Sequence, residues 1–245
     1  MDLGNVWTVA SKDFSIFRKK KSIIYSLIGF QLFVSIGLPL IVRFAGMKTG
    51  GIPTAVLPGL LNAFSFWFVI GAAVLPTGIA SYSLVGEKVE KSLEPLLATP
   101  VTDSEILMGK SLVAFMPAIV STYAGAALYM FLIDRITYSQ LGYLYYPNWT
   151  MGIILLAVAP LACILCVELN ILVSANANDV RTAQQIGMLL FLPFGVIYFL
   201  SELNYLPLNT TNLLIIFVVV LVADVILFFI SRSTFRREEI LTKWK

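Results

Sequence analysis

Few residues have side chains that could catalyse a reaction or bind a ligand, and these residues lie in apolar surroundings. Cys163 and Cys166 form a C-x-x-C pair within the run LACILCVELN. Such a pair can serve redox chemistry or form half of a zinc site, but the zinc site needs further Cys or His ligands. The sequence contains no histidine and no other cysteine. We therefore interpret both cysteines as small side chains of a membrane helix, and a Ser–His hydrolase is excluded.

A second motif comes close to a phosphate-binding loop. Residues 104–111 read SEILMGKS, and Ser104 stands where the G-x-x-x-x-G-K-[ST] pattern has its first glycine. That loop also needs a preceding buried strand and an aqueous α/β domain, whereas an apolar run follows Lys110. We predict that this chain binds no nucleotide and no cofactor, so any ATP and magnesium are held by a partner.

Two carboxylates interrupt apolar runs. Glu168 and Asp224 would be costly to bury unless they are paired or protonated. A hydrogen bond between helices and an ion or proton site are both open for them. Arg181 or a residue of the N-terminal segment 3–21 is a candidate partner for Glu168.

Composition places the whole chain in a membrane. Of its 245 residues, 58% are hydrophobic and 13% are charged, against about 25% charged residues in soluble domains. We expect one membrane domain over residues 1–245. The net charge of +3 gives no reason to expect nucleic-acid binding.

Six apolar runs are long enough to cross a bilayer, whose core takes about 20 helical residues. The predicted fold is therefore an all-α integral membrane protein with six transmembrane helices, because unpaired backbone is costly in lipid. The predicted spans are 22–44, 57–82, 111–133, 150–173, 186–203 and 212–231.

Positive charge predicts the orientation. If the N-terminus is inside, fourteen of the seventeen Lys and Arg residues lie on the cytoplasmic side. Only Arg43, Lys48 and Arg135 lie outside, which is a strong positive-inside bias. We expect a multi-pass protein of the cell membrane with both termini cytoplasmic. Two glycosylation patterns, at Asn148 and Asn209, then lie outside, and nothing in the sequence says whether they are used.

Residues 3–21 have the pattern of an amphipathic interfacial helix. One face carries apolar side chains and the other carries polar ones, so the helix is expected to lie on the inner leaflet. The apolar face consists of Leu3, Val6, Trp7, Ala10, Phe14 and Phe17, and the polar face of Thr8, Ser11, Lys12, Ser15 and Lys19.

Residues 86–110, GEKVEKSLEPLLATPVTDSEILMGK, form a charged island on the cytoplasmic side. A solvated connector would explain the charges but not the apolar residues among them. Thr102-Asp103-Ser104-Glu105 predicts a helix N-cap with acids in the first turn. An apolar knob with a charged rim is suited to docking on another protein.

Three stretches resemble the ABC-2 type transporter permeases. They are GEKVEKSLEPLLATPVTDSEILMGKSLVA, the start VWTVASKDFSIFRKKKS, which is similar to the elbow helix of that family, and VSANANDVRTAQQIG. The resemblance implies an ABC-2 type permease fold in which residues 86–110, here called the coupling segment, seat in a separate ABC ATPase (nucleotide-binding) subunit. The implied ATPase contacts are Glu90, Glu94, Leu96, Leu97, Thr99, Pro100 and Glu105, with Asp179 and Arg181 as a second contact.

The resemblance also implies a transporter built from two permease copies, a homodimer or a heterodimer, and no catalytic residue in this chain. Export by alternating access is the expected activity. Polar and aromatic residues of the second span are candidates for a substrate path, namely Asn62, Ser65, Trp67, Phe68 and Thr77. Five prolines within the spans allow kinks: Pro39, Pro76, Pro117, Pro160 and Pro193.

Other functions remain open at this point. An ion- or proton-coupled secondary transporter would use Glu168 and Asp224 and need no ATPase. A non-transporting membrane assembly subunit would use the same docking segment. A membrane enzyme is disfavoured, because the sequence lacks histidine and a paired-carboxylate motif. The substrate cannot be inferred from these residues.

Overall fold

The computed structural model describes residues 2–48, 52–89, 101–176, 179–189, 191–203 and 205–234. These residues form helices and no strands. Six stretches are long and apolar enough to cross a membrane, and each overlaps one of the predicted spans. They are Lys21–Phe44, Leu57–Tyr82, Asp103–Leu141, Trp149–Ser174, Val180–Glu202 and Thr210–Ser231.

Most spans are built from more than one helical element. The N-terminal helix α1 is Leu3–Phe17, and the first span joins α2 (Lys21–Leu32), the π-helical η1 (Phe33–Gly37) and α3 (Leu38–Lys48). The second span joins α4 (Leu57–Ser65), α5 (Trp67–Val74) and α6 (Thr77–Val89), and the third is α8 (Asp103–Leu141). The remaining elements are α9 (Trp149–Ile153), η2 (Ile154–Val158), α10 (Ala159–Asn176), α11 (Val180–Leu189), α12 (Leu192–Glu202) and α13 (Thr210–Thr234).

The five prolines account for most of these interruptions. Pro39 and Pro160 each lie two residues after a π-helical segment, where the wider turn accommodates the missing N–H. Pro76 lies between α5 and α6, and Pro193 lies in the first turn of α12. Pro117 alone is inside a continuous α-helix, α8. The kinks predicted from these residues are therefore mostly changes of helix type or short breaks.

Helix α8 is the longest element, and its ends are fixed by local sequence. Thr102 and Glu105 form a reciprocal capping box at the start, which confirms the predicted N-cap, and Gly142 ends the helix with a φ of 74°. At 1.5 Å per residue, 39 residues extend about 58 Å, nearly twice the roughly 30 Å of a bilayer core. Its first turns, before the predicted span 111–133, therefore lie outside the membrane core.

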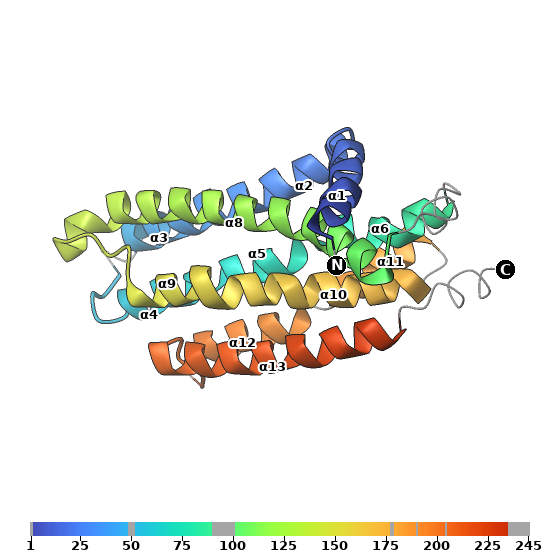
Figure 1. Ribbon diagram of the computed structural model, residues 1–245. Helices are drawn as coiled ribbons and strands as arrows, with labels where there is room; N and C mark the ends of the chain where they lie inside the picture. The colour runs from blue at the N-terminus through green and yellow to red at the C-terminus, as the bar shows by residue number, and fades with distance from the viewer. Residues whose placement is uncertain are drawn as a thin grey trace.

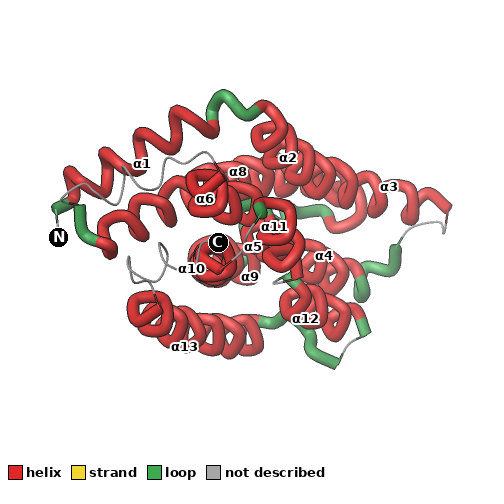
Figure 2. The backbone as a smooth tube through the Cα atoms, turned by 90° about the vertical axis from the view of Figure 1, so that its right-hand side faces the viewer, coloured by secondary structure: helices red, strands yellow, loops and turns green. Residues whose placement is uncertain are grey.

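The spans run side by side, and α1 lies across one end of the bundle (Figures 1 and 2). The end of α6, the start of α8 and the start of α11 are at this same end (Figure 1). Helix α10 is central, in contact with α5, α6, α8, α11 and α13. The second span is mostly buried, whereas α12 and α13 expose long apolar side chains, as expected of surfaces that face lipid.

Candidate coupling site and membrane path

The predicted coupling segment, residues 86–110, includes the end of one helix and the start of another. Val89 ends α6 and Asp103 begins α8, both at the end of the bundle where α1 lies (Figure 1). The predicted contacts Glu90, Glu94, Leu96, Leu97, Thr99 and Pro100 lie outside the described residues. Glu105 is the predicted contact of this segment that the structure places.

Glu105 is buried and faces the N-terminus of α1. Its carboxylate accepts hydrogen bonds from the backbone N–H of Asp2 at 2.6 Å, from the N–H of Thr102 at 2.9 Å and from the Asn5 amide at 3.4 Å. These bonds, that of Asp2 foremost, lower the pKa of Glu105 to about 2, because they stabilise the ionised form. In this chain Glu105 joins α1 to α8.

A buried ion pair fixes the same two helices one turn further on. The Nζ of Lys110 lies 3.3 Å from Oδ2 of Asp13, and both side chains are withdrawn from solvent. Gly109 packs so closely that a Cβ there would come within 2.9 Å of Val9 and 3.0 Å of the carbonyl oxygen of Val6. Helix α1 and the start of α8 are thus joined by charge, hydrogen bonds and steric fit.

The buried face of α1 differs from the predicted apolar face. Val6, Val9, Ala10, Asp13 and Phe17 are buried. In contrast, Leu3 and Trp7, predicted on the same face as Val6, are mostly exposed. The helix therefore has two apolar surfaces, one packed within the protein and one left for the membrane interface.

The second predicted contact lies on the surface. Asp179 and Arg181 are both exposed at the start of α11. Asp179 accepts hydrogen bonds from the Thr182 hydroxyl at 2.6 Å and the Thr182 N–H at 2.7 Å, which lower the pKa of Asp179. Helix α11 packs on α6, whose end belongs to the coupling segment. The exposed start of α11 is therefore linked to the coupling segment through α6.

Asn62 and Ser65, predicted to line a substrate path, are bonded to tyrosines. The Tyr145 hydroxyl donates to Oδ1 of Asn62 at 2.8 Å, and the hydroxyls of Ser65 and Tyr146 are 2.7 Å apart. Tyr145 and Tyr146 are held by Asp134, which accepts both of their backbone N–H groups. Sequence reasoning missed this cluster, because Asp134 precedes Tyr145 by 11 residues and no local motif links them.

The other predicted path residues lie deeper in the bundle. Phe68 is fully buried against Tyr129, with ring centroids 5.3 Å apart, and Trp67 stacks edge-on with Tyr198 at 5.4 Å. Thr77 is buried and accepts a hydrogen bond from Asn170 at 3.4 Å.

Asn170 is the centre of a polar cluster that was not predicted. Its amide donates to the carbonyl of Cys166, and its Oδ1 accepts from Ser81 at 3.1 Å. Ser174 donates to the carbonyl of Ser81 at 3.0 Å. An asparagine in an apolar run was the available signal, since such residues bond helices together in membranes. The cluster ties α10 to α6.

A cavity of about 420 Å³ lies at the opposite end of the bundle from α1. It is bordered by the start of α4, the end of α12 and residues 207–209. Asn62, Ser201, Glu202 and Asn209 supply polar atoms to its wall. Of the predicted path residues, Asn62 borders this cavity.

The two intramembrane carboxylates have buried oxygens without a partner among the described residues; Asp224 is buried and Glu168 is half-buried. Both oxygens of Asp224 and Oε2 of Glu168 accept no hydrogen bond from the described residues. The predicted pair of Glu168 with Arg181 is not formed, since no described cation lies within 4.0 Å of Glu168. Cys163 and Cys166 are buried free thiols, and the described residues contain no group of three or more Cys, Asp or Glu side chains arranged to hold a metal.

Comparison with known proteins identifies the family. A family model described as "ABC-2 family transporter protein" matches residues 7–216, which is most of the chain. A search of curated proteins found no match. The matched range begins in α1, includes the first five spans and ends in α13, so it agrees with the six-span helical bundle. The chain therefore belongs to the ABC-2 family of transporter proteins.

Proposed function

We propose that this chain is the permease subunit of an ATP-driven exporter in the cell membrane, with both termini cytoplasmic. The coupling segment, residues 86–110, engages a separate ABC ATPase subunit that binds ATP and magnesium. The observation that carries the proposal is the gathering of helix ends at one end of the bundle. The end of α6, the start of α8 and the exposed start of α11 lie there, beside α1.

The internal contacts support a mechanical role for this end. A displacement of the coupling segment moves α8 directly, because the segment includes the start of that helix. The Asp13–Lys110 ion pair and the hydrogen bonds of Glu105 then make α1 move together with α8. The Asn170 cluster carries the motion of α6 to α10 in the centre. Closure of two ATPase subunits would thereby reorient the spans, and two permease copies, identical or different, would enclose the path.

The cavity beside Asn62 supports an outward opening. It lies at the end remote from α1, and its wall combines apolar residues with a carboxylate and two amides. We propose that the substrate leaves the path there and that Asn62, Ser65, Trp67, Phe68 and Thr77 line or support the route.

The test is co-purification from the native membrane in mild detergent. The native protein is compared with a Glu94→Ala, Leu97→Ala variant and with a matched control, Glu202→Ala, Leu203→Ala. The control removes an acidic residue and a leucine from exposed positions at the other end of the bundle. Vanadate-sensitive ATP hydrolysis is assayed in each eluate.

We expect a P-loop ATPase to accompany the native chain and the control but not the coupling variant. If the ATPase also binds the coupling variant, the contact lies elsewhere. If the native chain purifies alone and without ATP hydrolysis, the permease proposal fails.

One observation favours a second candidate, an ion- or proton-coupled transporter. Asp224 is a buried carboxylic group and Glu168 a half-buried one, and each has a buried oxygen that no described residue bonds; they lie in the neighbouring helices α13 and α10. In vesicles without ATP, this candidate requires transport driven by an ion gradient and its loss in Asp224→Asn. The exporter requires transport only with ATP, with that substitution tolerated.

A further inference from the structure

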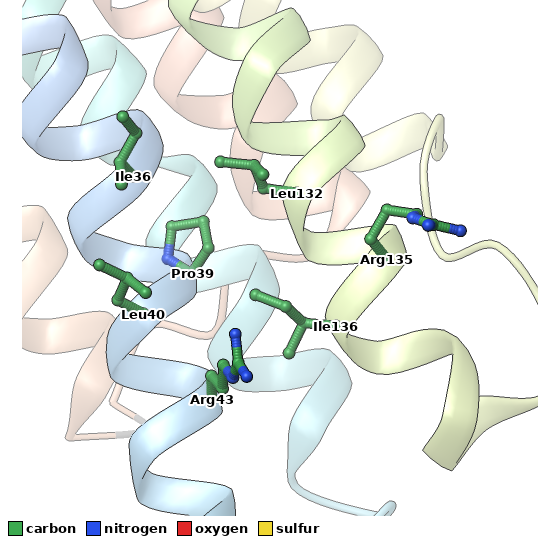
Figure 3. A pocket seen from close by; sticks show the side chains of 7 residues that line it. All are labelled: Ile36, Pro39, Leu40, Arg43, Leu132, Arg135 and Ile136. Atoms are coloured by element: carbon green, nitrogen blue, oxygen red, sulfur yellow. The ribbon is translucent and has the colours of Figure 1, made fainter.

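Two clefts follow the same pair of helices, the first span and α8. The inner cleft, about 470 Å³, is lined by Gln31 and otherwise by aliphatic and small residues of α2, η1 and α8, including Leu27, Ser121 and Ala124. The outer cleft, about 500 Å³, continues from Ile36 to Arg43 on one side and from Leu132 to Ile136 on the other (Figure 3). Together they form a groove along the surface of the bundle, here called the α2–α8 groove.

The groove exists because the two helices touch at its floor and separate towards the surface. Gly125 allows the contact, since a Cβ there would come within 2.7 Å of the Gln31 Oε1 and 2.9 Å of the Ser35 hydroxyl. Ser35 donates a hydrogen bond to the Gly125 carbonyl at 2.8 Å. Above this floor Ser121 and Ala124 are too small to fill the space.

Two arginines lie at the end of the groove that is remote from α1. Arg43 and Arg135 are exposed, and no described carboxylate lies within ion-pair distance of either. In Figure 3 the Arg43 guanidinium turns towards Ile136 across the cleft, whereas Arg135 extends away from it. An exposed arginine changes rotamer within nanoseconds, so Arg135 can turn in when an anion arrives.

We propose that the α2–α8 groove binds an anionic phospholipid, with its phosphate at Arg43 and an acyl chain along the apolar wall. Guanidinium groups bind phosphate oxygens through paired, charge-assisted hydrogen bonds. Ten residues separate Gly125 from Arg135, which is about 15 Å along α8. This is half of the roughly 30 Å bilayer core, so the part of the groove between Arg135 and Gly125 is as long as one leaflet is deep.

Charge decides between a lipid and a second copy of this chain. In a two-fold symmetric dimer within a membrane, the same face of each copy meets its equivalent at the same depth. Arg43 and Arg135 would then face their own copies with no described carboxylate beside them, which opposes that association. The inference requires a membrane-embedded bundle and does not depend on the ATPase partner.

The experiment is native mass spectrometry of the full-length protein, delipidated in detergent and titrated with lipid. Dioleoyl phosphatidylglycerol is compared with dioleoyl phosphatidylcholine, because the two differ only in headgroup. We expect preferential retention of phosphatidylglycerol. Arg43→Gln should weaken its binding about tenfold, as expected for loss of a charge-assisted contact, and Arg135→Gln should weaken it less.

Matched variants test the acyl-chain part of the groove. Ala124→Leu fills it and should weaken binding of both lipids, whereas Ala127→Leu, also exposed on α8 but outside the groove, should not. Arg43→Lys keeps the charge and should bind more of the lipid than Arg43→Gln. Size-exclusion profiles verify that each variant is folded.

Three results would overturn the proposal. Equal retention of the two lipids, or unchanged binding in Arg43→Gln, would remove the headgroup site. Full competition by soluble glycerol phosphate would mean an anion site that makes no use of the groove. A third result would be a dimer in the mass spectra of the native protein and the other variants that is absent from Ala124→Leu. It would mean that a second copy of the chain occupies the groove.

Discussion

Lys110 is a cation whose head is withdrawn from water at the junction of α1 and α8. Its partner Asp13 lies 97 residues earlier in the chain, and the two atoms are 3.3 Å apart. A buried pair of this kind contributes little when compared with apolar residues of the same shape, but an unpaired buried charge is costly. Each member therefore depends strongly on the other.

Removing one charge should destabilise the protein far more than removing both. We expect Lys110→Met to lower the unfolding free energy by about 3–5 kcal/mol, and Asp13→Val combined with Lys110→Met to recover most of that loss. Thermal unfolding in detergent measures the cycle. Lys19→Met, at an exposed position, is the control and should change stability little. A loss in the double variant equal to the sum of the losses in Lys110→Met and Asp13→Val alone would show that the two side chains act independently.

Glu105 gives the same junction a pH dependence confined to acid conditions. Its folded pKa of about 2 is below the ordinary value of 4.5, so the ionised carboxylate stabilises the fold fully above about pH 4.5. That stabilisation is lost as the pH falls towards 2. The difference in melting temperature between the native protein and Glu105→Gln should be constant from pH 8 to 5 and shrink below 4.5. A difference that changes between pH 8 and 6 would assign the effect to another group.

Removal of the Asp224 carboxyl group should not destabilise the protein, in contrast to removal of the charge of Glu105 or Lys110. The reason is that the Asp224 carboxyl group has no hydrogen-bond partner among the described residues. We expect Asp224→Leu to retain or raise the melting temperature, since it removes a buried polar group from the lipid-embedded helix α13. Asn170→Leu is the contrast, because it leaves Thr77 and Ser81 without their bonds and should destabilise. A lower melting temperature in Asp224→Leu would indicate a partner for this carboxyl in the assembled transporter.

At the scale of elements, α1 and α8 fit together through Gly109. We expect Gly109→Ala to cost about 1–3 kcal/mol, because the added methyl would meet Val9 and the Val6 backbone. Gly29→Ala in α2 is the matched control, since no atom lies within 4 Å of the position that its methyl would take, and it should leave stability unchanged or higher. Hydrogen exchange of α1 reports the effect, and protection of α1 should fall only in the first variant.

The elements themselves were largely predictable from sequence, because hydropathy and charge directly determine which segments enter a membrane. The six spans overlap the predicted runs, and the N-cap at Thr102 followed from its side-chain chemistry. The predicted span 111–133 covers only part of α8, since the turns beyond residue 133 are too polar to be counted as a span. Hydropathy identifies the span but not the helix that contains it.

The contacts between elements were not predictable in the same way. Sequence placed Val6 and Trp7 on one face of α1, but which part of that face packs on α8 depends on Gly109 and Lys110, about 100 residues away. Asn62 and Ser65 were identified as polar residues of the second span, whereas their bonds to Tyr145 and Tyr146 depend on the packing of distant segments. Most predicted ATPase contacts lie outside the described residues and remain predictions.

For the whole molecule, the charge distribution predicts which end of the bundle faces the cytoplasm. Native Cys163 and Cys166 are buried and should not react with a membrane-impermeant maleimide. We expect the reagent to label Trp149→Cys in intact cells and Lys19→Cys only after permeabilisation, because these exposed positions lie on opposite sides. The reverse labelling pattern would show that the protein has the opposite orientation, with the coupling segment on the outer side, where a cytoplasmic ATPase could not bind it.

The unbroken length of α8 has a mechanical consequence. A rod of about 58 Å that pivots at its midpoint by roughly 10° carries its two tips about 5 Å in opposite directions. One tip bears the contacts with α1, and the other bears Arg135 and Asp134, which accepts hydrogen bonds from the backbone of Tyr145 and Tyr146. A displacement of one tip would therefore be transmitted to the other side of the bilayer through one continuous helix, in which Pro117 is the point most able to bend.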